Sequence, residues 1–171
     1  MNHSVTSTVT VCPSCGSAGN GVSQTTMAAL LNDDRQDAVR DVEYGFCDTP
    51  GCDVVYFTAD ATRFTQGQLR VEIGVKQTTG ERPLCYCFGH SVESIKQEIR
   101  TVGETHALDD IRVTMQDQGC RCETENPSGM CCLGSVASGI ETAKAELEFD
   151  SGESDVSPAR SSNTVFEGEV R

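Results

Sequence analysis

Tryptophan is absent from this 171-residue chain, and aromatic residues of all kinds make up only 5% of it. Hydrophobic residues reach 37%, which is low for a domain that relies on one well-filled core. Long apolar segments are missing as well, because the longest unbroken run extends only from Met27 to Leu31. A bilayer-spanning helix needs about 20 apolar residues, so the sequence predicts no membrane insertion.

Basic residues are also scarce. The chain has 13 Lys and Arg residues against 26 Asp and Glu residues, which gives a formal net charge of −13 at pH 7. Such an acidic chain is repelled by phosphate backbones and anionic lipid surfaces, so we expect no nucleic-acid partner. The segment from Met1 to Val11 has no basic stretch followed by an apolar block and does not predict a secretory signal. We therefore expect a cytoplasmic protein.

Cysteine, in contrast, is abundant, with ten residues in the chain. Most of the cysteines fall in close pairs, and the positions are Cys12, Cys15, Cys47, Cys52, Cys85, Cys87, Cys120, Cys122, Cys131 and Cys132. In a reducing compartment, clustered cysteines are more typical of metal sites than of disulfides. Metal binding can also replace hydrophobic burial as a source of stability. The alternative is an exported protein with five disulfides.

The first four cysteines form two turns that suit one metal ion. Cys12 and Cys15 enclose Pro-Ser and are followed by a glycine, and this spacing lets both sulfurs reach one tetrahedral ion. Cys47 and Cys52 enclose a looser turn that contains Pro-Gly. A closed site of four thiolates favours zinc in a structural role. We predict that Cys12, Cys15, Cys47 and Cys52 hold a structural zinc ion.

A second set of cysteines begins at Cys85 and Cys87, which a single residue separates. With this spacing both sulfurs reach the same ion only in a bent loop. Further candidates lie at Cys122 and at the adjacent pair Cys131 and Cys132. A [2Fe–2S] cluster requires four thiolates, two on each iron, but four thiolates also suffice for a second zinc ion. The spacing alone leaves both readings open.

Apolar periodicity predicts a mixture of short strands and helices. We expect a helix over residues 25–31 capped by Thr25 or Thr26, strands over 39–46, 53–57 and 69–75, a helix over 91–100 that ends at Gly103, a short helix running into a strand over 108–115, and a helical stripe from 133 to 147. These elements divide the chain into a β-rich zinc-binding region at 1–84 and a helical region at 85–147. Residues 148–171 are predicted to be a disordered acidic tail.

Little in the sequence indicates an enzyme. His90 stands beside the cysteine pair but is typical of a polar residue that precedes a helix. His3 and His106 lie in polar segments without a carboxylate at an informative spacing, so no acid–base pair is evident. The sequence also lacks a phosphate-binding glycine loop and a dinucleotide fingerprint.

Six motifs, taken in order, resemble the N-terminal domain of the CopZ copper chaperones. They are Cys12-Pro-Ser-Cys15-Gly, the pair Cys47 and Cys52, Val54-Val55-Tyr56-Phe57, Gly74-Val75-Lys76, Leu84-Cys85-Tyr86-Cys87 and Asn126-Pro127-Ser128-Gly129-Met130-Cys131-Cys132. The resemblance covers the chain from about residue 10 to about residue 135. Because all six motifs occur in the right order, their combination is specific.

The resemblance implies an α+β fold, with a small zinc-ribbon-like β region followed by a helical [2Fe–2S] domain resembling the bacterioferritin-associated ferredoxin. It implies zinc at the first four cysteines and a [2Fe–2S] cluster at Cys85, Cys87, Cys122 and Cys132. Counting back from Asn126 favours Cys122 over Cys120, and we prefer Cys132 to Cys131.

The same resemblance implies a role in copper handling. Full-length members of the family carry a second domain with a Met-x-Cys-x-x-Cys copper loop, and this sequence contains no such loop. We therefore expect a one-electron module that reduces Cu(II) to Cu(I) for a separate copper carrier and itself holds Cu(I) only transiently. Its partner would be a metal-transport or redox protein. The alternative is a non-redox iron–sulfur or metal-binding interaction module.

Overall fold

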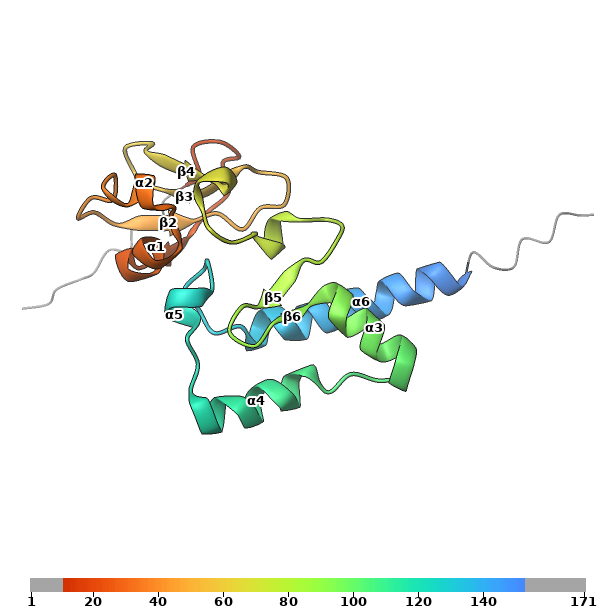
Figure 1. The fold of residues 1–171 in the computed structure, drawn as a ribbon. Coiled ribbons are helices and arrows are strands. Elements are labelled where there is room, and N and C mark those ends of the chain that lie inside the picture. The colour runs from red at the N-terminus through yellow and green to blue at the C-terminus, as the bar shows by residue number, and fades with distance from the viewer. Residues whose placement is uncertain (1–10, 153–171) are drawn as a thin grey trace, which may run out of the picture.

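The computed structural model describes residues 11–152, which form an α+β fold with a sheet-bearing half and a helical half (Figure 1). The elements in chain order are β1 (Asn20–Val22), α1 (Gln24–Leu30), α2 (Asp33–Gln36), β2 (Tyr44–Phe46), β3 (Val54–Phe57), β4 (Arg63–Thr65), the 3₁₀ helices η1 (Gln66–Gln68) and η2 (Gly74–Lys76), β5 (Pro83–Cys85), β6 (His90–Ser91), α3 (Val92–Val102), α4 (Ala107–Gln118), α5 (Cys122–Glu125) and α6 (Leu133–Gly152).

The first half is built on an antiparallel sheet with strand order β1-β2-β3-β4. Phe57, at the end of β3, is fully buried. It belongs to a small buried cluster with Val54 and three of the first four cysteines, Cys12, Cys47 and Cys52. Its ring lies directly on the backbone of two glycines, since an added Cβ would come within 2.4 Å of the ring at Gly19 and 2.7 Å at Gly45. These glycines therefore let the aromatic ring close the core beneath the cysteine turns.

Helix α1 covers a separate apolar core on this sheet, which includes Met27, Leu30, Tyr44, Val55 and Tyr56. The predicted helix is present, but its cap is Ser23, whose side chain accepts a hydrogen bond from the backbone N–H of Thr26. The prediction of Thr25 or Thr26 as the cap is wrong, because the helix begins one residue earlier. The chain then enters the short helix α2.

Two predicted strands are shorter than expected or absent. Of residues 39–46 only Tyr44–Phe46 is a strand. Residues 69–75 form no ladder, because Leu69 makes a single bridge to Leu31 and the N–H of Arg70 donates to the carbonyl of Leu30. The segment is held at the end of α1, and Leu69 and Ile73 enter the core that α1 shares with the sheet, so its alternating pattern marks a buried face and not a strand.

The helical half packs α3, α4 and α6 around a second core with the β5–β6 hairpin at one end. The predicted helix over 91–100 is confirmed as α3, which Ser91 caps and Gly103 ends in a left-handed conformation with φ of 94°. The predicted strand within 108–115 is wrong, because α4 is helical from Ala107 to Gln118 and buries Ile111.

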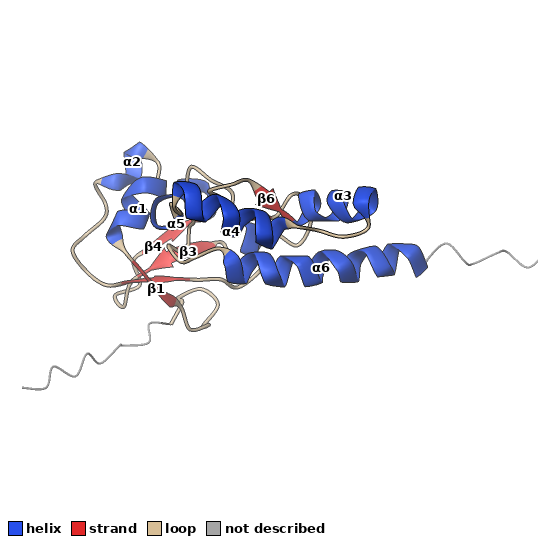
Figure 2. Cartoon of the chain, turned by 90° about the horizontal axis from the view of Figure 1, so that it is seen from below, coloured by secondary structure: helices blue, strands red, loops and turns tan. Residues whose placement is uncertain are grey.

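Helix α6 is the longest helix among residues 11–152, and it extends beyond the other elements (Figure 2). It continues to Gly152, so the predicted tail begins later than residue 148. The rest of that predicted disordered tail lies outside the described residues. None of the helices within the described range is long and apolar enough to cross a membrane.

The two halves are joined by packing of α5 against α1 and by two tyrosine hydroxyls. Tyr56 on β3 donates a hydrogen bond to the carbonyl of Pro127 at 2.7 Å. Tyr86 donates to the carbonyl of Glu72 at 2.7 Å and accepts from the N–H of Gly74 at 3.0 Å. Each tyrosine thus fixes a loop of the helical half on the sheet-bearing half.

Candidate metal centres

The first four cysteines meet at one point. The sulfur atoms of Cys12, Cys15, Cys47 and Cys52 all lie within 4.8 Å of one another. Cys12 and Cys52 are 3.9 Å apart at their sulfurs, and Cys15 and Cys47 are 3.7 Å apart. Zn–S bonds of about 2.3 Å in a tetrahedron place the sulfurs about 3.8 Å from each other. The geometry therefore fits a four-thiolate zinc ion.

Local turns explain how each pair is presented. In the first turn the N–H of Gly16 donates to the carbonyl of Cys12 at 2.9 Å, and Gly16 has a φ of 75° that favours glycine. In the second turn the N–H of Cys47 donates to the carbonyl of Val55 at 2.8 Å, which ties the cysteine to β3. Gly51 has a φ of 77°. Both turns therefore depend on the glycines that the sequence spacing singled out.

The four sulfurs differ in their surroundings. Cys12, Cys47 and Cys52 are buried, whereas Cys15 is exposed. Burial raises the pKa of Cys12 to about 11, and backbone hydrogen bonds from Cys15 and Ser14 oppose this shift. Cys15 behaves in the opposite way, because hydrogen bonding to the hydroxyl of Thr49 lowers its pKa to about 5. One face of the centre is thus open to solvent and the other is closed.

One neighbour of this centre is a buried lysine. The ammonium of Lys76 lies 3.2 Å from the sulfur of Cys47, to which it donates a hydrogen bond. Sequence reasoning quoted Lys76 only as part of a motif and gave it no role. Charged residues already alternate with apolar ones in this segment, at Arg70 and Glu72, so no local signal marks Lys76.

The second set of thiols forms two contacting pairs. The sulfur of Cys132 lies 3.1 Å from that of Cys85, and the sulfur of Cys87 lies 3.8 Å from that of Cys122. Cys85, Cys122 and Cys132 belong to the same buried apolar cluster, and Cys87 packs against it. The structure therefore gathers the four residues that the sequence analysis named for a cluster.

The cysteines of the second set are less exposed to solvent than the two cysteines that neighbour them in the sequence. Cys85, Cys122 and Cys132 are buried and Cys87 is half-buried, whereas Cys120 and Cys131 are exposed. Burial raises the pKa of Cys122 to about 12 and raises the pKa of Cys132 as well. Thiols in this environment become thiolates only when a nearby positive charge, such as a metal ion, compensates for the lost hydration.

Two tight loops hold the second set. Cys85 ends β5 and Cys87 lies in the connection to β6, where the N–H of Gly89 donates to the carbonyl of Cys85 at 2.9 Å. Asn126 organises the other loop, because its side-chain amide donates to the carbonyl of Met130 at 3.0 Å. Its side-chain oxygen accepts from the N–H of Ser128 at 3.1 Å. The loop then delivers Cys132 to the start of α6.

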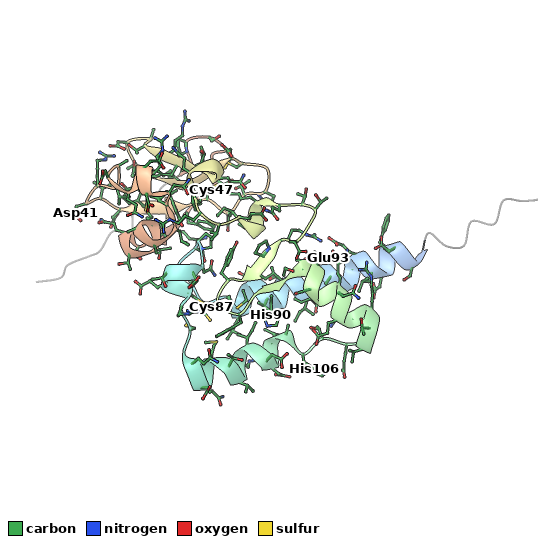
Figure 3. The ribbon with its side chains drawn as sticks, in the orientation of Figure 1. Asp41, Cys47, Cys87, His90, Glu93 and His106 are labelled. Atoms are coloured by element: carbon green, nitrogen blue, oxygen red, sulfur yellow. The ribbon has the colours of Figure 1, made fainter. Side chains whose placement is uncertain are left out.

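His90 lies next to the second thiol set, because it pairs with Cys85 across the β5–β6 hairpin. Cys47 lies in the sheet-bearing half, and Cys87 and His90 lie in the helical half (Figure 3). His90 is part of β6 and His106 precedes α4, where its ring lies 3.5 Å from the carboxylate of Glu104. His3 falls outside the described residues. All ten cysteines are free thiols, in contrast to the alternative of five disulfides.

An antiparallel sheet with a four-thiol centre, followed by a helical half with its own buried thiols, defines a metal-binding protein. Residues 9–70 match the sequence model of a family described as the CopZ zinc-binding domain. The chain is 30% identical over 144 residues to the copper chaperone CopZ of Archaeoglobus fulgidus, which covers 81% of this chain and 68% of that protein.

A solved structure agrees with this match. The X-ray structure of the Archaeoglobus fulgidus CopZ N-terminal domain superposes with a TM-score of 0.60 and 29% identity, covering 71% of this chain and 91% of that one. This chain belongs to the CopZ-type zinc-binding domain family. The family resemblance inferred from the sequence motifs is thereby confirmed.

Proposed function

We propose that this chain is a zinc- and [2Fe–2S]-binding protein that transfers single electrons in copper handling. The observation that carries the proposal is the presence of two thiol sets of different geometry. In the first set all sulfurs lie within 4.8 Å of one another. In the second set the sulfurs form two contacting pairs, at 3.1 Å and 3.8 Å, but the four sulfurs do not form one group within 4.8 Å. One compact set suits one ion, and two pairs suit two irons.

The first centre has a structural role in this proposal. Cys12, Cys15, Cys47 and Cys52 would hold zinc, and the four sulfurs leave no coordination position for a substrate. The buried ligands join the ends of β2 and β3 to the first turn. The zinc ion would therefore add to the stability that the apolar core between α1 and the sheet provides.

The second centre supplies the redox chemistry. When bound, a [2Fe–2S] cluster accepts and gives one electron at a time, at a potential set by its surroundings. Cys85, Cys122 and Cys132 would shield it, and the half-buried Cys87 would leave one edge near the surface. Such an edge gives a short path to a metal ion or a protein docked outside.

Copper is the substrate in this proposal, because the relative of this chain is named a copper chaperone. Cu(II) takes up one electron and becomes Cu(I), which prefers soft sulfur ligands. Met130 and Cys131 line a cleft of about 530 Å³, and Cys131 adjoins a proposed cluster ligand. These sulfurs would hold Cu(I) transiently before a metal-transport protein takes it, and a cytoplasmic redox partner would return the electron.

Anaerobic purification followed by metal and sulfide analysis tests the proposal. We expect zinc together with iron and sulfide at two atoms each per zinc, and a paramagnetic signal in the reduced protein. Addition of Cu(II) should bleach that signal and produce one Cu(I) per electron, measured with a Cu(I)-specific chelator. A loaded cluster that Cu(II) leaves reduced would instead support the alternative, a non-redox metal-binding module.

A further inference from the structure

Lys76 is a buried cation with an unusual set of partners. It is the last residue of η2 and is only 5% exposed. Its ammonium donates one hydrogen bond to the sulfur of Cys47 and one to the carbonyl of Thr49, both at 3.2 Å. Across residues 11–152, no carboxylate lies within 4.0 Å of this ammonium. Within the described part of the chain, the sulfur of Cys47 is therefore the one partner of this ammonium that can carry negative charge.

A second buried lysine, on α3, has carboxylate partners. Lys96 is also buried, but its ammonium pairs with the carboxylates of Glu146 and Glu93. A buried charge without an opposite charge is strongly destabilising. For Lys76 the partner in the corresponding position is the sulfur of Cys47 at 3.2 Å, which would be anionic as a zinc-bound thiolate.

The charge of a four-thiolate zinc site explains why a cation belongs there. A Zn²⁺ ion neutralises only half of the charge of four thiolates. On the second turn, the ammonium of Lys76 donates a hydrogen bond to the sulfur of Cys47. Outer partners of this kind orient metal ligands and tune the metal.

We propose that Lys76 is a positioning residue of the zinc site, which compensates the charge of the thiolates through its hydrogen bond to Cys47. The proposal rests on zinc binding at the first four cysteines. In this proposal zinc affinity depends on a residue of η2 as well as on the four cysteine ligands, although η2 lies far from them along the chain.

The test compares Lys76→Met with Lys144→Met. Methionine is close to lysine in shape, so the first variant removes the charge and keeps most of the packing. Lys144 lies on α6 with its side chain 54% exposed, and its substitution changes the net charge of the chain by the same amount. We expect zinc affinity, measured anaerobically by competition with a chromophoric chelator, to fall about 10- to 100-fold in Lys76→Met. Lys144→Met should match the wild type.

Cobalt substitution provides a readout that a purely structural role would not change. A hydrogen bond from a cation lowers the energy of the sulfur lone pairs, so its loss should move the thiolate-to-Co(II) charge-transfer band to longer wavelength. We expect that shift in Lys76→Met and not in Lys144→Met. A Lys76→Arg chain keeps the charge, and its band should stay at the wild-type position even if Lys76→Met fails to fold.

Each outcome decides between two readings. Equal zinc affinity in Lys76→Met and the wild type would overturn the proposal, as would an unshifted Co(II) band. An equally large loss in Lys76→Arg and Lys76→Met would show that packing, and not charge, matters at this position. If the wild-type chain itself bound no zinc, the zinc site would fail, and this result is distinct from any difference between variants.

Discussion

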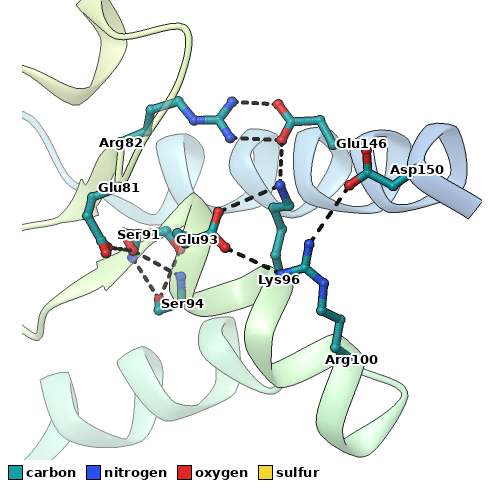
Figure 4. Close-up of polar contacts among 9 residues, drawn as sticks. All are labelled: Glu81, Arg82, Ser91, Glu93, Ser94, Lys96, Arg100, Glu146 and Asp150. Atoms are coloured by element: carbon teal, nitrogen blue, oxygen red, sulfur yellow. Dashed lines mark hydrogen bonds and ion pairs between the residues drawn. The ribbon is translucent and has the colours of Figure 1, made fainter.

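Glu146 on α6 holds two buried cations of the helical half. Its carboxylate accepts hydrogen bonds from both terminal nitrogens of Arg82, at 2.5 and 2.8 Å, and from the ammonium of Lys96 at 3.1 Å (Figure 4). Arg82 lies just before β5, and Lys96 lies on α3. One carboxylate therefore connects three segments that are distant in sequence, and we predict that Glu146→Gln loosens their packing.

The size of the effect follows from the electrostatics of the site. The Arg82 guanidinium, followed by Lys96, lowers the pKa of Glu146 from its ordinary value of 4.5 to about 2. That difference corresponds to roughly 3 kcal/mol of stabilisation. The Glu146 side chain is 35% exposed, and solvent screening reduces the value to about 1–2 kcal/mol. We expect Glu146→Gln to lower the free energy of unfolding at pH 7 by that amount.

The same pKa fixes the dependence on pH. A carboxylate whose pKa is lower in the folded state stabilises the fold above its unfolded pKa and loses this contribution as the pH falls through the folded value. The stability difference between wild type and Glu146→Gln should be complete at pH 7. It should shrink as the pH falls below about 4.5 and vanish near 2. The cysteine thiols titrate in the same way in both proteins, so their contribution cancels in the stability difference between wild type and Glu146→Gln.

Urea unfolding followed by the helical circular dichroism signal measures the effect. For a chain of this size we expect the midpoint to fall by roughly 0.5–1 M. Glu141→Gln is the matched control, since Glu141 lies on the same helix with its side chain 79% exposed, and its change should stay within about 0.5 kcal/mol. Equal midpoints for wild type and Glu146→Gln at pH 7 would refute the reasoning, and so would a difference that grows with acidity.

Three further substitutions test the metal centres and the connection between the halves. Cys52→Ser should abolish zinc binding and unfold the sheet-bearing half, because a structural zinc contributes on the order of 10 kcal/mol; native melting without zinc would contradict this. Cys122→Ser should remove the paramagnetic signal of the reduced protein. Cys120→Ser, which changes an exposed thiol, should keep that signal. The reverse pattern would make Cys120 the cluster ligand in place of Cys122. Tyr56→Phe should cost about 1–2 kcal/mol in thermal unfolding, because it leaves the buried carbonyl of Pro127 without its donor, and an unchanged melting temperature would count against that connection.

Local chemistry made the first thiol set and helix α3 predictable from the sequence. Two turns with cysteines at short spacing and glycines at positive φ need only a few neighbouring residues to form. Helix α3 likewise begins at a capping serine, Ser91, and ends at Gly103, and both signals act within one turn of helix. Such features depend on bonds between residues close in the chain.

Contacts between distant segments decided the rest. The alternation in residues 69–75 predicted a strand. In the structure this segment makes its backbone contacts with the end of α1, through Leu31 and Leu30. The spacing of the cysteines also does not indicate whether Cys131 or Cys132 faces the core. The start of α6 buries Cys132 against Cys85 and leaves Cys131 exposed, because the helix direction fixes the side on which each residue points.

The sequence by itself therefore determined the family, the presence of two thiol sets and most of the helices, since all of these follow from residue type and short-range spacing. The tertiary structure alone determined the pairing of Cys85 with Cys132 and of Cys87 with Cys122, and the position of Lys76 beside Cys47. These contacts join residues far apart in the chain. They form only where two packed cores bring the segments together, and no local pattern encodes that meeting.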